Sequence, residues 1–122
     1  MTESNVQLAR RGYEAMVRGD LGAIEEIMDP DVRWHGGDPT GGCQNRKQTL
    51  GWMRKNWMSR GAPPGEVVDM VDAGDKVVVI MRRTGADGEP ELIANLTTFR
   101  DGKVIEMVHY PDPDDARAAA GV

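Results

Sequence analysis

Hydrophobic positions in the first part of the chain follow helical spacing. Over residues 5–18 the apolar side chains recur every three or four positions, which places them on one face of a helix. Ser4 stands where it can cap the first turn, and Gly19 where it can end the last one. The pattern predicts an amphipathic helix over residues 5–18.

Two more helices are expected before residue 61. Asp20 can cap a short one over residues 21–28, which Pro30 brings to an end, and residues 32–35 then form a short strand. A third helix is predicted over residues 46–60, with Asn45 before it and Gly61 after it. Its apolar stripe contains Leu50, Met53 and Trp57.

From residue 66 onward the pattern changes to strands separated by turn residues. Strands are predicted over residues 66–73, 76–84, 91–100 and 103–110, with glycine-containing turns between them. An acidic, alanine-rich tail from residue 112 can form a short final helix. Helices followed by a run of hairpins predict an α+β fold, in one domain over residues 1–122, and not a parallel α/β sheet.

Both faces of the last two strands are largely apolar. In the final strand, Ile105, Met107 and His109 alternate with Val104 and Val108. A sheet that is apolar on both faces has to be covered on both. Helices can cover the inner face, and we expect a second copy of the chain on the outer one, as a homodimer.

Composition and net charge limit the classes of partner that the protein is expected to bind. A net charge of −5 with scattered basic residues argues against nucleic acid. No apolar run approaches the roughly 20 residues of a membrane span, and the first residues are polar, so we expect no membrane partner and a cytoplasmic location. One Cys and two His argue against a disulfide or a metal site, and no cofactor motif is present.

A few polar residues in apolar surroundings are candidates for chemistry. His109 ends an apolar strand face, where it is either a structural hydrogen-bonding group or a base in a pocket. Asn95, in mid-strand, has the same two interpretations. Trp34 and His35 are neighbours and should point to opposite faces, unless the strand bends at Gly36. The tryptophans Trp34, Trp52 and Trp57 are core residues or an aromatic pocket wall.

Several segments, in this order, resemble one superfamily. They are residues 13–24 (YEAMVRGDLGAI), residues 28–34 (MDPDVRW), the glycine-rich loop before the third helix, and residues 98–110 (TFRDGKVIEMVHY). The chain is similar to SnoaL-like and ketosteroid isomerase-like members of the nuclear transport factor 2 superfamily. The resemblance implies a cone-shaped half-barrel, usually dimeric, with three N-terminal helices packed on a curved, mainly antiparallel sheet around a pocket. Members include isomerases, dehydratases, cyclases, epoxide hydrolases and non-catalytic binders.

The resemblance also implies roles for single residues. The catalytic carboxylate of ketosteroid isomerases falls near Gly36, between His35 and Asp38, and their helix-one tyrosine falls one residue before Tyr13. Their protonated aspartate corresponds to Asn95, which can donate a hydrogen bond to an oxyanion without protonation. With two of the three groups replaced or displaced, true ketosteroid isomerase activity is not expected. SnoaL-like cyclases have a histidine and an aspartate where this chain has His109 and Asp112.

Two hypotheses result. In the first, the protein is a cofactor-independent isomerase, cyclase or dehydratase that acts on a small hydrophobic carbonyl compound. His109 is then the base, Asn95 the oxyanion donor, and His35 with Asp38 a second acid/base pair. The residues expected to contact the ligand are Tyr13, Trp34, Trp57, Met107 and Asp112. In the second hypothesis, the same fold is a non-catalytic ligand-binding or dimerisation module.

Overall fold

A computed structural model describes residues 4–38, 40–56 and 65–122. In these residues the elements are α1 (Asn5–Arg18), α2 (Leu21–Glu26), β1 (Met28–His35), α3 (Arg46–Asn56), β2 (Glu66–Ala73), β3 (Lys76–Thr84), β4 (Pro90–Arg100), β5 (Lys103–Tyr110) and α4 (Pro113–Ala120). The predicted α+β order is confirmed, and the four hairpin strands lie within one residue of their predicted bounds.

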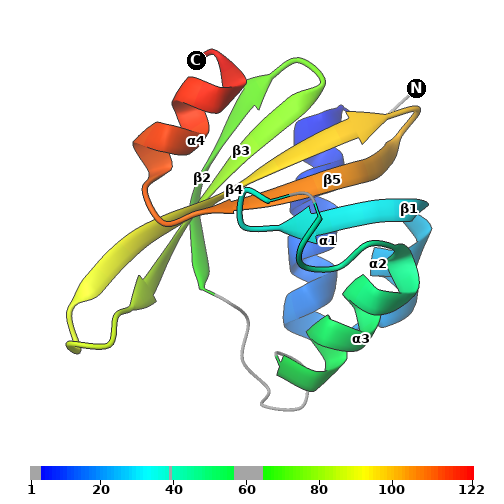
Figure 1. The fold of residues 1–122 in the computed structure, drawn as a ribbon, viewed down its shortest axis with the longest axis horizontal. Helices are drawn as coiled ribbons and strands as arrows, with labels where there is room; N and C mark the ends of the chain where they lie inside the picture. The colour runs from blue at the N-terminus through cyan, green and yellow to red at the C-terminus, as the bar shows by residue number, and fades with distance from the viewer. Residues whose placement is uncertain (1–3, 39, 57–64) are drawn as a thin grey trace.

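The strands form one curved sheet in the order β1-β5-β4-β3-β2. Strands β2 to β5 pair antiparallel in sequence order, and β1 joins the free edge of β5 in parallel. Figure 1 shows α1, α2 and α3 on one side of the sheet and α4 on the other. None of the helices seen in the described ranges is long and apolar enough to cross a membrane.

Helix α1 begins and ends where its sequence predicts. The Ser4 hydroxyl accepts a hydrogen bond from the Gln7 amide, and the Gln7 side chain accepts one from the Ser4 amide, which completes a capping box. Gly19 ends the helix in the left-handed conformation, at φ 73°. These caps fix the face that α1 turns to the sheet.

The segment after α1 differs from the prediction in two places. Helix α2 ends at Glu26 and not at Met28, because the chain joins the sheet at once: the Val104 amide donates to the Ile27 carbonyl at 2.7 Å. Pro30 lies inside β1, where the register with β5 shifts, so its missing N–H costs no ladder bond. The predicted end of the third helix, with Trp57, lies outside the described residues.

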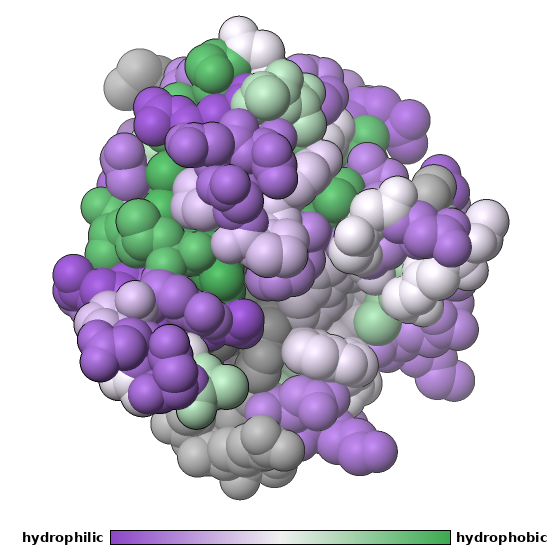
Figure 2. All heavy atoms as spheres, turned by 60° about the vertical axis from the view of Figure 1, so that its left-hand side comes forward, coloured by the Kyte–Doolittle hydropathy of each residue, from purple (hydrophilic) through white to green (hydrophobic). Residues whose placement is uncertain are grey.

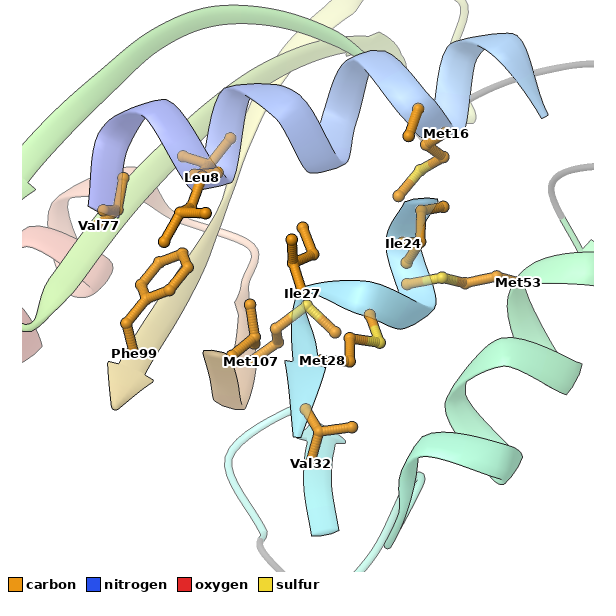
Figure 3. Packing of buried hydrophobic residues seen from close by; sticks show 14 of the residues in the cluster. Leu8, Met16, Ile24, Ile27, Met28, Val32, Met53, Val77, Phe99 and Met107 are labelled. Atoms are coloured by element: carbon orange, nitrogen blue, oxygen red, sulfur yellow. The ribbon is translucent and has the colours of Figure 1, made fainter. Parts of the chain in front are cut away.

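The main core fills the space between the inner sheet face and the first three helices. Figure 3 shows Met16 of α1, Ile24 of α2 and Met53 of α3 pointing toward one another, with Phe99 of β4 near Leu8 at the other end. All are at most 9% exposed. Long, flexible methionine side chains are well suited to fill an irregular space between helices that meet at different angles.

An irregularity in β5 corrects the predicted strand faces. We expected Val104 and Met107 on opposite faces, yet both lie in the inner core. The register shifts between Thr98 and Phe99, so that Thr98 pairs with Glu106 and Phe99 with Val104, and Ile105 has no partner across β4. Beyond this bulge the expected alternation resumes.

The outer sheet face is covered in part by α4. Ala116 of α4 is fully buried, and it packs with one apolar residue set on β3, β4 and β5: Val78, Ile80, Ala94, Leu96 and Val108. The acidic tail thus supplies cover that we expected from a second subunit, and the homodimer stays a prediction. Figure 2 shows one face of the molecule, where hydrophilic residues cover most of the surface, with one larger hydrophobic group on the left and single hydrophobic residues elsewhere.

The contact between α4 and the sheet predicts unequal effects of two substitutions. Ala116→Asp places a carboxylate against apolar side chains and should lower the free energy of unfolding by about 2–4 kcal/mol. Ala118→Asp, on the exposed side of the same helix, should lower it by at most about 1 kcal/mol. Urea unfolding measures both. Equal losses would mean that α4 does not pack on the sheet as described.

The glycine-rich loop after β1 folds back on the strand that it leaves. Trp34 and Cys43 exchange two backbone hydrogen bonds, of 2.9 and 2.8 Å. Gly42, just before Cys43, has φ 69°, and a Cβ atom there would lie 2.2 Å from the Trp34 carbonyl oxygen. Only glycine fits this close approach of two backbones.

Gly42→Ala should therefore open the loop. The strained conformation and the clash predict a loss of about 1–3 kcal/mol in the free energy of unfolding, with a change in the fluorescence of the neighbouring tryptophan. Gly36→Ala is the matched control, because a Cβ atom at Gly36 meets nothing within 4 Å. A loop that tolerates both substitutions equally would contradict the described crossing.

Candidate functional site

A cleft of about 660 Å³ opens on the inner side of the sheet, beside the third helix and the glycine-rich loop. This volume is typical of small-molecule sites. The residues that line it come from β1, the loop, α3, β3, β4 and β5: Trp34, His35, Gly36, Gly42, Cys43, Trp52, Met81, Arg83, Ile93, Asn95 and His109.

Strand register brings two of the predicted catalytic residues together. Asn95 of β4 pairs directly with His109 of β5, and residues paired across neighbouring strands share a face. Both line the cleft. This pairing depends on the register shift between Thr98 and Phe99, because the turn register alone would place Asn95 opposite Val108.

Asn95 is held by a tyrosine from the first helix. The side chain of Asn95 is buried, and its Nδ2 donates to the Tyr13 hydroxyl at 2.9 Å. Its Oδ1 atom is buried without a hydrogen-bond partner among the described residues. Buried amide oxygens are nearly always bonded, so this one is available to a ligand or an ordered water.

Tyr13 reaches the site although it follows the family's tyrosine position by one residue. The offset of one residue in α1 does not separate it from Asn95. Burial raises the pKa of Tyr13 to about 12, partly offset by the hydrogen bond from Asn95, so the hydroxyl stays protonated at physiological pH. Tyr13 and Met107 line a cavity of about 40 Å³ behind Asn95, and not the cleft itself.

His109 has the environment of a neutral base. Burial and the positive charge of Arg83 lower its pKa from 6.5, so the imidazole is unprotonated near neutrality. The described residues supply no hydrogen bond to either ring nitrogen. The ring is free to accept a proton from a group in the cleft.

Two tryptophans supply aromatic surface to the same cleft. The rings of Trp34 and Trp52 lie 4.7 Å apart between centroids at an angle of 75°, an edge-to-face contact. Trp52 is 41% exposed, which is high for a tryptophan, and its exposed surface borders the cleft. Trp57 lies outside the described residues.

The other histidine has a different partner. His35 pairs in register with Val108, an outer-face residue, while Trp34 pairs with Met107 on the inner face. Its Nε2 lies 3.0 Å from Glu106, and the Gly37 amide donates to its Nδ1 at 3.1 Å. These bonds place the proton of the neutral ring on Nε2. The His35 residue borders the cleft, but its imidazole bonds Glu106 on the face opposite Trp34.

The two aspartates named from sequence have local roles in the structure. Asp38 is exposed and accepts hydrogen bonds from the amide and hydroxyl of Thr40, which lower its pKa. Asp112 caps α4 by accepting a hydrogen bond from the Asp114 amide at 2.9 Å. Neither lines the cleft, so the predicted pairing of His35 with Asp38 has no counterpart in its wall.

Sequence reasoning missed Arg83. It follows Val77, Val79 and Met81 at alternate positions of β3, so the alternation that defines the inner face continues to a charged residue at the mouth of the cleft. Following that alternation one step further would have found it. Cys43 was also not assigned to the site, because its place depends on the loop crossing back to Trp34.

Metal ligands do not gather in the part of the chain that the structure describes. No group of three or more His, Cys, Asp or Glu side chains is placed there to hold an ion.

The fold is shared with many solved structures. Bal32a, from a soil-derived mobile gene cassette, superposes with a TM-score of 0.72 at 22% identity, over 87% of each chain. A nuclear transport factor 2-like protein of unknown function from Cytophaga hutchinsonii gives 0.71 at 16% identity, over 94% of this chain and 96% of the other. A Pseudomonas putida protein with the provisional description of a polyketide cyclase gives 0.67 at 17% identity, over 93% and 96%. At these identities the likeness shows the fold.

Sequence comparison identifies the family. A comparison with curated proteins gave no match. The family model for the SnoaL-like domain, in contrast, matches residues 9–107, which include every described residue of the cleft wall except His109. Together with the curved sheet and its nuclear transport factor 2-like neighbours, this match shows that the chain belongs to the SnoaL-like domain family.

Proposed function

We propose that the protein binds a small hydrophobic carbonyl compound in the cleft and moves a proton at the carbon next to the carbonyl group. The observation that carries the proposal is the cross-strand pair of Asn95 and His109 in one wall of the cleft. An amide that keeps a second N–H beyond the one bonded to Tyr13, and a neutral imidazole whose ring nitrogens no described residue bonds, are the donor and the base that enolisation requires.

The proposed step uses one base and one hydrogen-bond donor. A ring nitrogen of His109 takes the proton from the carbon, and the electron pair of the broken bond moves onto the carbonyl oxygen. The second N–H of the Asn95 Nδ2, which Tyr13 does not accept, donates to the resulting enolate oxygen. If a C=C bond is conjugated with the enolate, return of the proton from His109 to the far carbon gives isomerisation. Attack of the enolate carbon on a second carbonyl of the same ligand gives cyclisation, and the alkoxide formed takes the proton from His109. Neither route requires a cofactor.

Tyr13 serves as a positioning residue in this proposal. Its hydroxyl accepts the hydrogen bond that fixes the Asn95 amide, and it lies behind Asn95 at the internal cavity. The aromatic wall of Trp34 and Trp52 supplies apolar surface for the body of the ligand. His35 and Asp38 receive no part in proton transfer, since their bonds lead to Glu106 and Thr40.

Proton exchange tests the proposal without knowledge of the natural substrate. In heavy water the protein should accelerate deuterium uptake at the acidic carbon of β-tetralone, followed by NMR. His109→Gln should slow the catalysed rate by about 10²- to 10⁴-fold. Asn95→Leu should slow it by about 10²- to 10³-fold.

His35→Gln is the comparison variant for this assay, and it should change the rate less than about twofold. Binding of β-tetralone without any exchange would contradict the enzymatic proposal and favour the alternative, a non-catalytic ligand-binding module. Equal effects of His35→Gln and His109→Gln would contradict the assignment of the base.

The pH dependence of exchange follows from the state of His109. The unprotonated ring is the active form, so the rate should be constant above the lowered pKa of His109 and should fall as the pH drops through it. Arg83→Gln removes a positive charge and should move the midpoint of the profile to higher pH. NMR titration of the histidine ring protons checks the same shift directly. A midpoint that stays in place or moves down would show that Arg83 does not act on His109.

A further inference from the structure

The cleft carries one permanent charge, and that charge is positive. Among the described residues that line it, Arg83 is the only one that is charged at every physiological pH, and no carboxylate lines the wall with it. The chain as a whole has a net charge of −5, so this local sign is opposite to that of the molecule. Arg83 is ion-paired with Glu91 outside the lining, but within the cleft its guanidinium meets only neutral polar, aliphatic and aromatic side chains, which favours an anionic ligand.

Arg83 is fixed in a way that leaves its outer edge available. Its Nε donates to Glu91 at 2.7 Å, across the β3–β4 pair. The second carboxylate oxygen of Glu91 lies toward Gly85, at the turn of that hairpin. No further bond to a described residue engages the guanidinium, so its two terminal NH₂ groups remain as donors. A guanidinium edge of this kind matches the two oxygens of a carboxylate.

The second donor to such an anion is the N–H of the neutral His109 ring on β5, which β4 separates from β3. His109 and Arg83 line the same cleft, and no described residue bonds the ring nitrogens of His109. In the same cleft, the edge-to-face pair of Trp34 and Trp52 offers apolar aromatic surface. The cleft thus has a charged end and an aromatic end.

We propose that the ligand of this cleft is a hydrophobic carboxylate, whose anionic group binds Arg83 and whose ring or chain lies against Trp34 and Trp52. The inference rests on the proposed function, because it names the substrate class of the same site. It adds a specificity residue, Arg83, which recognises a part of the ligand that does not react.

Two probes of the same shape test the charge requirement. β-Naphthoate and methyl β-naphthyl ketone differ in the presence of the negative charge. Dissociation constants come from titrations at low salt, followed by the indole N–H signals of the tryptophans in NMR spectra. The carboxylate should bind about tenfold more tightly than the ketone, as expected for one charge-assisted pair. High salt should reduce this difference.

The two adjacent arginines of β3 provide a matched pair of variants. Arg83→Gln should remove the preference for the carboxylate while the ketone still binds. Arg82→Gln should keep the preference, because Arg82 lies on the other face of the strand and bonds Glu66 at 2.8 Å. Circular dichroism shows whether each variant is folded.

Any of the following results would overturn the inference. Equal binding of the two probes to the unaltered protein excludes charge recognition, as does loss of the preference in both arginine variants. Binding of neither probe excludes this ligand class. The exchange assay with neutral β-tetralone tests the proposed function separately. If the protein catalyses exchange but shows no preference for the carboxylate, this inference is refuted and the proposed function stands.

Discussion

A sheet that is apolar on both faces is the constraint on which the rest of the structure depends. The inner face of β3, β4 and β5 is covered by α1, α2 and α3 along most of its length, and α4 covers part of the outer face. The three helices do not cover one end of these strands, and the cleft opens there. There the inward positions that elsewhere hold Val77 and Phe99 hold Arg83, Asn95 and His109. The site is thus the uncovered end of the core.

Much of this arrangement was readable from the sequence, because it depends on local rules. Strand alternation grouped Asn95 and His109 with apolar neighbours on one face of each strand, and glycine-containing turns set the hairpin bounds to within one residue. Caps at Ser4 and Gly19 fixed α1. These features need only information from residues within about four positions along the chain or directly across a hairpin.

The remainder depends on contacts between distant segments, which no local pattern encodes. The bulge at Ile105 reverses the face of Val104, and a single extra residue leaves no signature in an apolar strand. The bond between His35 and Glu106 requires the parallel pairing of β1 with β5, across 71 positions. Comparison with the family along α1 places Tyr13 one residue after the family's tyrosine. Whether its hydroxyl meets Asn95 depends instead on how α1 packs on the sheet, and there the two are hydrogen-bonded.

The hydrogen bond between Tyr13 and Asn95 also bears on when the site comes into existence. It joins residues 82 positions apart, one on the first helix and one on the fourth strand. Such contacts close long loops and form only after most of the chain has been ordered. During synthesis on a ribosome, Tyr13 therefore emerges long before its partner, and the amide can be oriented only when β4 has been made and has joined the sheet. Folding of the domain and assembly of its binding wall are one event.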